Sequence, residues 1–125
     1  MKLERKAEII EMLCCHENNF TAEEYFEDLR KKGQEFKSEK DYIDLSNFGR
    51  AISSVERLII LNALKEKDRC VCELEVILDK SQSTVSHHLR KLENAGLVQG
   101  YKNGNYTYYS LEKQNLRKHV SILEL

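Results

Sequence analysis

Apolar residues recur at helical spacing through most of this chain, and they alternate at strand spacing only near residue 100. Helical spacing, with apolar side chains three or four positions apart, runs through residues 2–17, 21–33, 42–52 and 53–64 and returns after Ser110. The charged stretch 34–41 lacks this pattern and predicts a loop. Pro is absent and Gly is sparse, which favours a helix-rich chain.

Two helix starts carry a capping box, in which a Ser or Thr hydroxyl and a Glu carboxylate each bond to the other residue's backbone amide. Thr21 with Glu24 predicts one start, and Ser53 with Glu56 predicts another. The first start belongs to an arm of two predicted helices. We assign residues 1–41 to this N-terminal helical arm and residues 42–125 to a second domain.

Residues 70–96 predict two helices joined by a tight turn, and the second helix has two contrasting faces. Ser81 is a favoured N-cap residue, and Gly96 is a favoured helix stop. The predicted core stripe is made of Val85, Leu89 and Leu92. The opposite side carries short or fork-shaped hydrogen-bonding residues: Ser83, Ser86, His87 and Arg90. Such side chains can bond to base edges and phosphates in a major groove, although an ordinary solvated face fits the same pattern.

A β-hairpin is predicted directly after this helix. Residues 97–102 and 105–110 have strand character, and Asn103-Gly104 between them is a strong signal for a tight turn. Helix, turn, helix and hairpin in this order indicate a winged helix-turn-helix, a mainly α fold (α+β) with a two-stranded wing. The strands close the core in this interpretation. The tip contacts the DNA backbone through Lys102, Asn103 and Asn105.

Four segments together resemble the ArsR/SmtB family of metalloregulators. They are Arg57-Leu58-Ile59-Ile60-Leu61, Cys70-Val71-Cys72-Glu73-Leu74, the segment from Ser81 to Val98, and Tyr108-Tyr109-Ser110-Leu111. The match covers roughly residues 45–125. Where the family often has Asp-Pro-Thr-Arg, this chain has Ser-Val-Glu-Arg and keeps only Arg57.

The resemblance implies a homodimeric winged-helix repressor of bacteria or archaea, with residues 42–125 as its DNA-binding and dimerisation domain. Such a repressor leaves its operator when an inducer binds, often a thiophilic metal or metalloid ion. The predicted contacts with double-stranded operator DNA are Gln82, Ser83, Thr84, Ser86, His87, Arg90, Lys91, Lys102, Asn103 and Asn105.

Cys70 and Cys72 are the first candidates for binding such an ion. Inside a regular helix, residues two positions apart point about 200° apart. At a helix start the first residue is not yet helical, so both thiols can converge. The helix N-terminus and Arg69 favour the thiolate forms that bind metal. Each cysteine could instead serve as a small buried apolar residue.

Cys14 and Cys15 are the candidates for completing the ligand set. Trivalent arsenic or antimony takes about three thiolates, and cadmium, lead or zinc accepts about four. The resemblance supports a site that joins the Cys-Val-Cys pair to cysteines of an N-terminal arm, often the arm of the other protomer. The predicted metal ligands are therefore Cys70, Cys72, Cys14 and Cys15, with His16 as a further candidate. Cys14 also lies on the apolar stripe of its helix, where a structural role fits equally well.

Several properties of this site stay open. The inducer is As(III) or Sb(III), or a soft divalent ion such as Cd, Pb or Zn, and no organic cofactor is expected. The arm could reach the Cys70–Cys72 pair within one protomer or across the dimer.

The last helix predicts the dimer interface. Leu116, Val120 and Leu123 stand at i, i+4 and i+7, and little of the domain is left for them to cover. The alternative is that these residues pack within one chain only. Some family members bind zinc on this helix, but Arg117 and Ile122 stand where that pattern has acidic residues. We therefore expect His119 to be an ordinary surface or interface histidine.

The charge distribution suits DNA better than the net charge of −1 suggests, because residues 80–108 carry four basic residues against Glu93 alone. The sequence has no apolar run of about 18 residues and no apolar signal region. We expect a cytoplasmic protein with reduced thiols and no membrane partner.

Two other functions fit the same residues. The same fold could sense oxidants through a disulfide among these cysteines. A small metal-carrying thiol protein, with DNA binding incidental, is a further alternative. An enzyme is not expected, because the sequence has no phosphate-binding Gly loop, nucleophile elbow or zincin motif.

Overall fold

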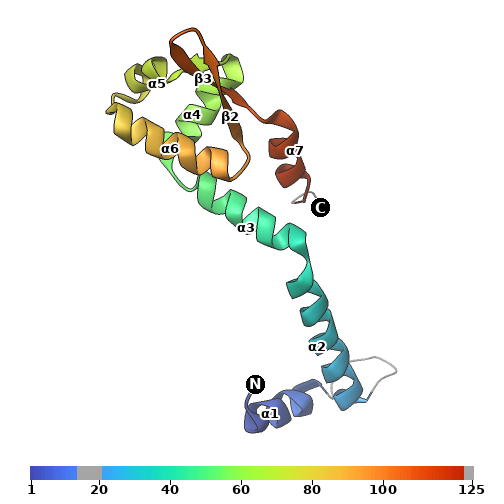
Figure 1. Cartoon of the computed structure of the whole chain (residues 1–125). Coiled ribbons are helices and arrows are strands. Elements are labelled where there is room, and N and C mark those ends of the chain that lie inside the picture. Colours follow the sequence, from blue (N-terminus) through green and yellow to red (C-terminus); the bar gives the residue numbers. More distant parts are fainter. Residues whose placement is uncertain (14–20, 123–125) are drawn as a thin grey trace. The chain divides into compact units, whose positions relative to one another are not determined.

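The computed structural model describes residues 1–13 and 21–122 (Figure 1). They belong to two compact units, Met1–Tyr42 and Ile43–Leu125. Four residues named above lie outside the described residues: Cys14, Cys15, His16 and Leu123. No helix in the described ranges is long and apolar enough to cross a membrane.

Two helices make up the N-terminal unit, α1 (Leu3–Leu13) and α2 (Ala22–Ser38). Thr21 caps α2 as predicted, since its hydroxyl oxygen accepts a hydrogen bond from the backbone N–H of Glu24 at 3.2 Å. Phe26 of α2 is buried, and the ammonium group of Lys6 lies 5.1 Å from the centre of its ring. A cation–π contact therefore links the two helices.

α2 continues through Ser38, so the prediction of a loop over residues 34–41 is wrong. Glu39 alone separates α2 from α3 (Lys40–Ile52). Glu and Lys are good helix formers, so a stretch rich in them can stay helical without an apolar stripe. The ring of Phe36 also meets the ring of Tyr42 edge to face, with centroids 6.4 Å apart.

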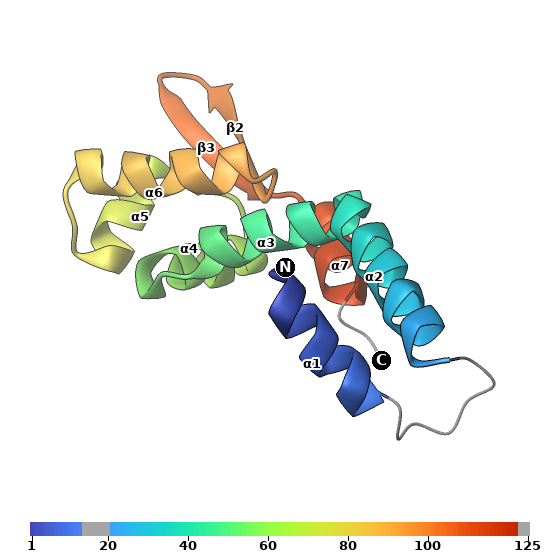
Figure 2. The ribbon, with the colours of Figure 1, turned by 90° about the horizontal axis from the view of Figure 1, so that it is seen from below.

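The C-terminal unit is a helix-turn-helix followed by a hairpin and a last helix (Figures 1 and 2). After α3 its elements are α4 (Val55–Glu66), β1 (Arg69–Cys70), α5 (Val71–Leu78), α6 (Gln82–Asn94), β2 (Val98–Asn103), β3 (Tyr106–Leu111) and α7 (Lys113–Ile122). α5 and α6 form the helix-turn-helix. Asp79 between them has a left-handed backbone with φ of 52°, which turns the chain. The predicted winged helix-turn-helix fold is confirmed.

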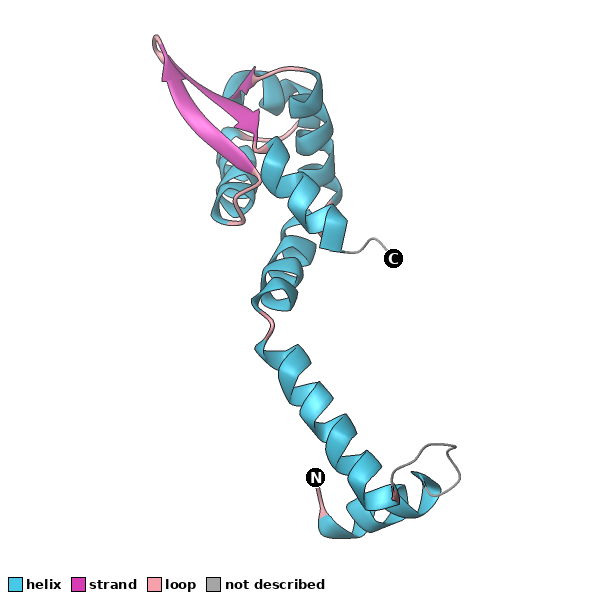
Figure 3. Cartoon of the chain, turned by 90° about the vertical axis from the view of Figure 1, so that its right-hand side faces the viewer, coloured by secondary structure: helices cyan, strands magenta, loops and turns pink. Residues whose placement is uncertain are grey.

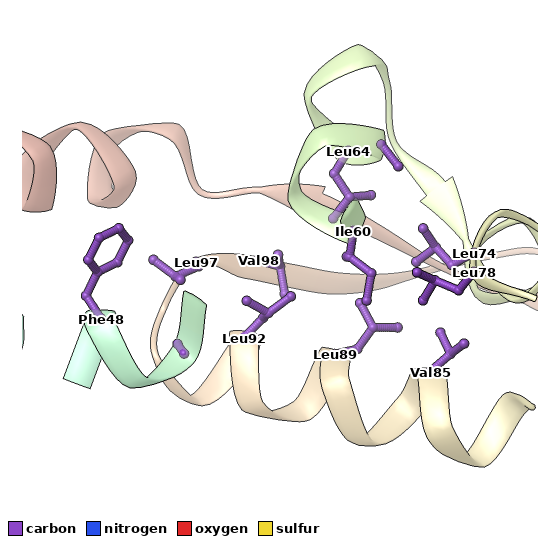
Figure 4. Close-up of a cluster of buried hydrophobic side chains, with 12 residues drawn as sticks. Phe48, Ile60, Leu64, Leu74, Leu78, Val85, Leu89, Leu92, Leu97 and Val98 are labelled. Atoms are coloured by element: carbon purple, nitrogen blue, oxygen red, sulfur yellow. The ribbon is translucent and has the colours of Figure 1, made fainter. Parts of the chain in front are cut away.

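One apolar core joins α4, α5, α6 and the first strand of the hairpin (Figure 4). The predicted stripe of α6, which is Val85, Leu89 and Leu92, has no exposed surface. Ile60 of α4 and Leu74 of α5 are equally buried and belong to the same cluster. The core therefore determines which side of α6 stays at the surface.

The hairpin projects away from the helices and belongs to a three-stranded antiparallel sheet with the order β1-β3-β2 (Figure 3). The sequence predicted only β2 and β3. The additional strand β1 is two residues long, and Arg69 and Cys70 pair with Tyr109 and Tyr108 of β3. So short a strand has no periodicity of its own and forms only because β3 lies beside it.

The turn of the hairpin lies one position later than predicted. Asn103 pairs with Tyr106 across the strands, so Gly104 and Asn105 are the turn residues. Gly104 has a φ of 64°. Asn105 is not among the residues with a positive φ. A positive φ at the first central residue but not at the second is the signature of a type II′ turn, which favours Gly at the first place.

Ser54, rather than the predicted Ser53, caps α4. Its hydroxyl oxygen accepts from the backbone N–H of Arg57 at 3.3 Å and donates to the carboxylate of Glu56 at 3.2 Å. Adjacent serines give the same sequence signal, so the predicted cap at Ser53 is wrong by one residue.

His119 is buried, which corrects the expectation of a surface histidine. Its ring stacks on the ring of Phe48 with centroids 4.7 Å apart, so α7 returns against α3. Leu116 also packs on the core, whereas Val120 is 54% exposed. The apolar residues of α7 are thus divided between the core and the surface.

Candidate nucleic-acid interface and thiol pair

Ser81 caps α6 and holds together the first turn of the predicted reading helix. Its hydroxyl accepts from the backbone N–H of Thr84 at 3.3 Å and donates to the Thr84 hydroxyl at 3.0 Å. The Ser83 hydroxyl lies 3.1 Å from the same oxygen. These bonds fix the start of α6, where a recognition helix meets base edges.

The predicted DNA contacts on α6 differ in exposure. Thr84 and Ser86 are half-buried. The exposed ones are Gln82, Ser83, His87, Arg90 and Lys91. Arg90 and Lys91 supply positive charge in the second half of the helix, while the uncharged donors and acceptors stand nearer its start. This is a surface on which cations can meet phosphates and short side chains can reach bases.

The remaining predicted contacts, Lys102, Asn103 and Asn105, are exposed at the tip of the hairpin. Lys102 and Asn105 line a hollow that Gln82 of α6 also lines. The wing tip and the start of α6 are therefore neighbours, and residues predicted from two separate motifs share one part of the surface.

Arg57 and His88 form an internal contact that the sequence did not reveal. The buried Arg57 donates from Nε to the backbone oxygen of Ala51 at 2.6 Å and from Nη2 to that of Arg50 at 3.3 Å. Its Nη1 lies 3.1 Å from Nδ1 of His88 on α6. Arg57 therefore fastens the end of α3 and the reading helix to α4. The only sequence signal was the arginine retained from the family's turn motif.

The contact with Arg57 determines the protonation of His88. A guanidinium group can only donate, so Nδ1 of His88 must be the unprotonated acceptor and the ring proton sits on Nε2. Partial burial lowers the pKa of His88, and the positive charge of Arg57 lowers it further. His88 is thus held neutral on the inner side of α6, while its neighbour His87 is exposed.

The thiols of Cys70 and Cys72 meet at the start of α5. Cys70 ends β1 and is the N-cap residue of α5, so its backbone is extended, with φ of −78° and ψ of 160°. Their Cα atoms lie 5.4 Å apart, a normal separation for bonded cysteines, and the sulfurs are joined as a disulfide. Cys70 is buried, whereas Cys72 is exposed.

Glu73 and Arg69 frame the thiol pair. The Glu73 carboxylate accepts from the backbone N–H of Cys70 at 3.1 Å and from Nη1 of Arg69 at 3.3 Å. The backbone N–H of Cys70 and the Arg69 side chain hold the pKa of Glu73 below its usual value. Arg69 also pairs with Glu66 at 2.7 Å. Two carboxylates thus offset the charge of Arg69. The positive charge that the sequence places beside the two cysteines is therefore partly neutralised.

Both thiols open into the hollow that contains the wing tip. The hollow has a volume of about 330 Å³ and is lined by Cys70 and Cys72, by Glu75 of α5, and by Lys102 and Asn105 of the hairpin, among others. Thiol sulfurs are suitable donors for a soft ion. The described residues contain no group of three or more His, Cys, Asp and Glu side chains placed to hold a metal. Reduction of the disulfide would free two thiols, which are the soft donors that the described residues can offer.

A family model for bacterial regulatory proteins of the arsR family matches residues 54–99. The matched segment includes α5, both thiols and α6.

Two relatives show similarity beyond that segment. The chain is 34% identical to a cadmium resistance transcriptional regulatory protein, CadC, of Listeria innocua, over 94% of this chain and 87% of that protein. It is 37% identical to an arsenical resistance operon repressor of Staphylococcus xylosus, over 60% of this chain and 72% of that protein.

A solved structure has the same fold. An ArsR-like transcriptional regulator from Rhodococcus sp. RHA1 superposes with a TM-score of 0.61 and 29% identity, over 66% of this chain and 77% of that one.

Proposed function

Because the chain belongs to the arsR family of transcriptional regulators, we propose that it is a metal- or metalloid-responsive repressor. It binds operator DNA as a homodimer and leaves the operator when its thiolates bind As(III) or Sb(III), or a soft divalent metal ion. The observation that carries the proposal is the meeting of two thiols beside the wing tip and the start of α6. The protein acts in the cytoplasm, which keeps thiols reduced and contains the operator DNA.

Operator binding uses α6 in the major groove and the hairpin tip on the backbone. Arg90, Lys91 and Lys102 neutralise phosphates, and Gln82, Ser83 and His87 reach base edges. Half-buried Thr84 and Ser86 shape the groove-facing side, and Asn103 and Asn105 touch the sugar-phosphate backbone. Exposure of the charged and amide side chains supports these roles.

Dimerisation uses α7, which presents Val120 to solvent. Two copies related by a twofold axis place two α6 helices about one DNA turn apart, as a palindromic operator requires. Any change in the spacing of the two DNA-binding surfaces then costs affinity.

The inducer site combines Cys70 and Cys72 with Cys14 and Cys15. Two thiols are fewer than arsenic, antimony or a divalent soft ion takes, so the ion needs donors from elsewhere in the dimer. Similarity to the Listeria cadmium regulator over 94% of the chain includes most of the N-terminal arm, which supports the arm as the source. An ion lowers operator affinity when it binds the free repressor more tightly than the DNA-bound one.

Titration of the reduced protein on its own upstream DNA tests this function. Arsenite, antimonite, cadmium, lead and zinc are added in parallel, and DNA release is read together with thiolate-to-metal absorption. Cys70→Ser with Cys72→Ser should keep operator binding and abolish release. Cys14→Ser with Cys15→Ser tells whether the arm contributes ligands: release by trivalent ions needs about three thiols, and release by cadmium or lead about four. Release that survives in the Cys70 and Cys72 variant places the inducer site elsewhere.

A thiol-redox sensor is the second candidate, and the joined sulfurs of Cys70 and Cys72 favour it. Peroxide would take two electrons and two protons from the two thiols, leaving a disulfide and two waters. Metal-free release of the operator by peroxide, reversed by a dithiol reductant, supports this candidate. A repressor that ignores peroxide and responds to metal excludes it.

A further inference from the structure

Cys70 belongs to the sheet of the wing as well as to the helix-turn-helix. It caps α5, and as the last residue of β1 it pairs with Tyr108 of β3. Strands in a sheet are held by backbone hydrogen bonds, so a displacement of Cys70 is passed directly to β3. The first thiol is therefore one strand away from the wing.

A second link fastens the other wing strand to the same place. The hydroxyl of Tyr101 on β2 donates to the carboxylate of Asp68 at 2.7 Å, and Asp68 lies just before β1. The ring of Tyr101 also stacks on that of Tyr108, with centroids 5.9 Å apart. Both strands of the wing are thus tied to residues 68–70, next to the thiol pair.

The wing is held less firmly than α6. Three residues of α6 are fully buried in the core, and Arg57 holds His88 from the inner side. At the tip of the hairpin, by contrast, residues 101–106 are all exposed. The base of the hairpin is anchored, because Val98 belongs to the core and Tyr109 and Leu111 pack against it, so the part of the wing that can move is its outer part. Segments with few buried contacts open at lower free-energy cost than core elements. A force applied at Cys70 will therefore displace the wing before it displaces the reading helix.

We propose that an ion bound at Cys70 and Cys72 weakens operator binding by displacing the wing, through β1 and the Tyr101–Asp68 hydrogen bond, while α6 keeps its place in the core. The inference rests on the proposed function and specifies its regulation. Lys102 and Asn105, which share the hollow with the thiols, are the DNA contacts that the displacement removes.

The test is a double-mutant cycle with Tyr101→Phe and Asp68→Ala in the full-length, reduced protein. Operator affinity is measured with and without cadmium ion, and the ratio of the two affinities is the coupling. Couplings between sites are roughly 5- to 150-fold. Each variant should reduce the ratio about three- to tenfold, and the double variant should lose no more than either single one, because both remove the same bond.

Tyr106→Phe is the matched control. It removes a hydroxyl from the same hairpin, and that hydroxyl makes no hydrogen bond among the described residues. Its coupling ratio should equal that of the wild type. Asp68→Ala lies outside the hairpin, so its affinity without cadmium should stay within about twofold of the wild type.

Amide hydrogen exchange gives a readout that does not depend on DNA. Cadmium should speed exchange in residues 101–108 of the wild type and leave the amides of Val85, Leu89 and Leu92 unchanged. A full coupling ratio in both variants, or faster exchange in α6 with an unchanged wing, overturns the inference and leaves the proposed function standing. A wild-type protein that no soft ion releases from its operator overturns the proposed function, and this inference with it.

Discussion

Arg57 shows how one buried charge can organise several elements at once. Its three hydrogen-bonding nitrogens reach the last turn of α3 and a ring nitrogen on α6. Two of these contacts are backbone carbonyls at the end of a helix, where a positive charge is favourable. The third needs a neutral His88. The position of α6 is therefore linked to the protonation of His88, a half-buried residue on the inner side of this helix.

His88 should make the folded protein less stable in mild acid. Its pKa is lowered in the folded state, so between that value and the unfolded value of 6.5 the unfolded chain binds more protons. The stability contributed by neutral His88 is complete above pH 6.5 and is lost as the pH falls toward the folded pKa. His88→Asn keeps an acceptor for Arg57 and does not titrate. Urea unfolding at a series of pH values should show that the free energy of unfolding falls less with decreasing pH in the variant than in the wild type. Equal pH dependence in the two proteins contradicts the role given to His88.

The structural elements differ in how much of them the sequence reveals. The stripe of Val85, Leu89 and Leu92 predicted the buried side of α6, because a regular period in the chain becomes a regular face in the helix. β1 and the Arg57–His88 contact could not be predicted in this way. Their partners lie about 40 and 31 residues away, and such partners leave no local pattern.

Small local ambiguities explain the other differences between sequence and structure. Ser53 and Ser54 are both good caps, so only the fold decides between them. From the sequence, Gly104 could be either the first or the second residue of a two-residue turn. The pairing of Asn103 with Tyr106 makes it the first. For the candidate site, the sequence identified the side-chain types, and the structure added the neighbourhood of thiols and wing tip. Metal binding and DNA contact stay predictions at each of these residues.

The wing turn should be sensitive to a single methyl group. A Cβ on Gly104 would meet no neighbouring atom, so the cost of Gly104→Ala comes from its φ of 64° alone, about 1–2 kcal/mol. Gly49→Ala is the matched control, since Gly49 lies inside α3 with open space around its Cα. It should raise stability by up to about 1 kcal/mol. Thermal unfolding measures both changes. Operator affinity should fall only for Gly104→Ala, and a turn that tolerates alanine without loss contradicts the turn type.

The whole molecule combines a slightly acidic composition with a basic binding surface. The sequence pI is about 6.4, yet α6 and the hairpin, which are the predicted DNA-contacting elements, carry Arg90, Lys91 and Lys102. Four acidic residues, Glu23, Glu24, Glu27 and Asp28, lie on α2 of the N-terminal unit. A local basic surface of this kind lets a protein of low net charge approach DNA.

Salt should weaken operator binding steeply, and each phosphate contact should contribute to the slope. The slope of log affinity against log salt changes by about 0.9 for each contact, and a homodimer loses two contacts per substitution. Lys102→Ala and Lys91→Ala should each flatten the slope by about 1.8. Lys113→Ala, on α7 and away from the predicted contacts, is the control. The slope is obtained from operator affinities measured by fluorescence anisotropy over a series of salt concentrations. If a lysine variant leaves the slope unchanged, that lysine does not contact a phosphate.

The unequal burial of the two thiols has a consequence for the time course of the response. Cys72 is exposed and Cys70 is 6% exposed, so an arriving ion meets Cys72 first and reaches Cys70 only after a local opening. Cys72 then determines how fast the ion is captured, and Cys70 determines how long it stays bound. In rapid-mixing experiments, Cys72→Ser should slow the capture of cadmium, whereas Cys70→Ser should leave capture fast and hasten the ion's escape. A cell that carries this repressor would respond quickly when the ion appears and would return slowly to repression after the ion is removed.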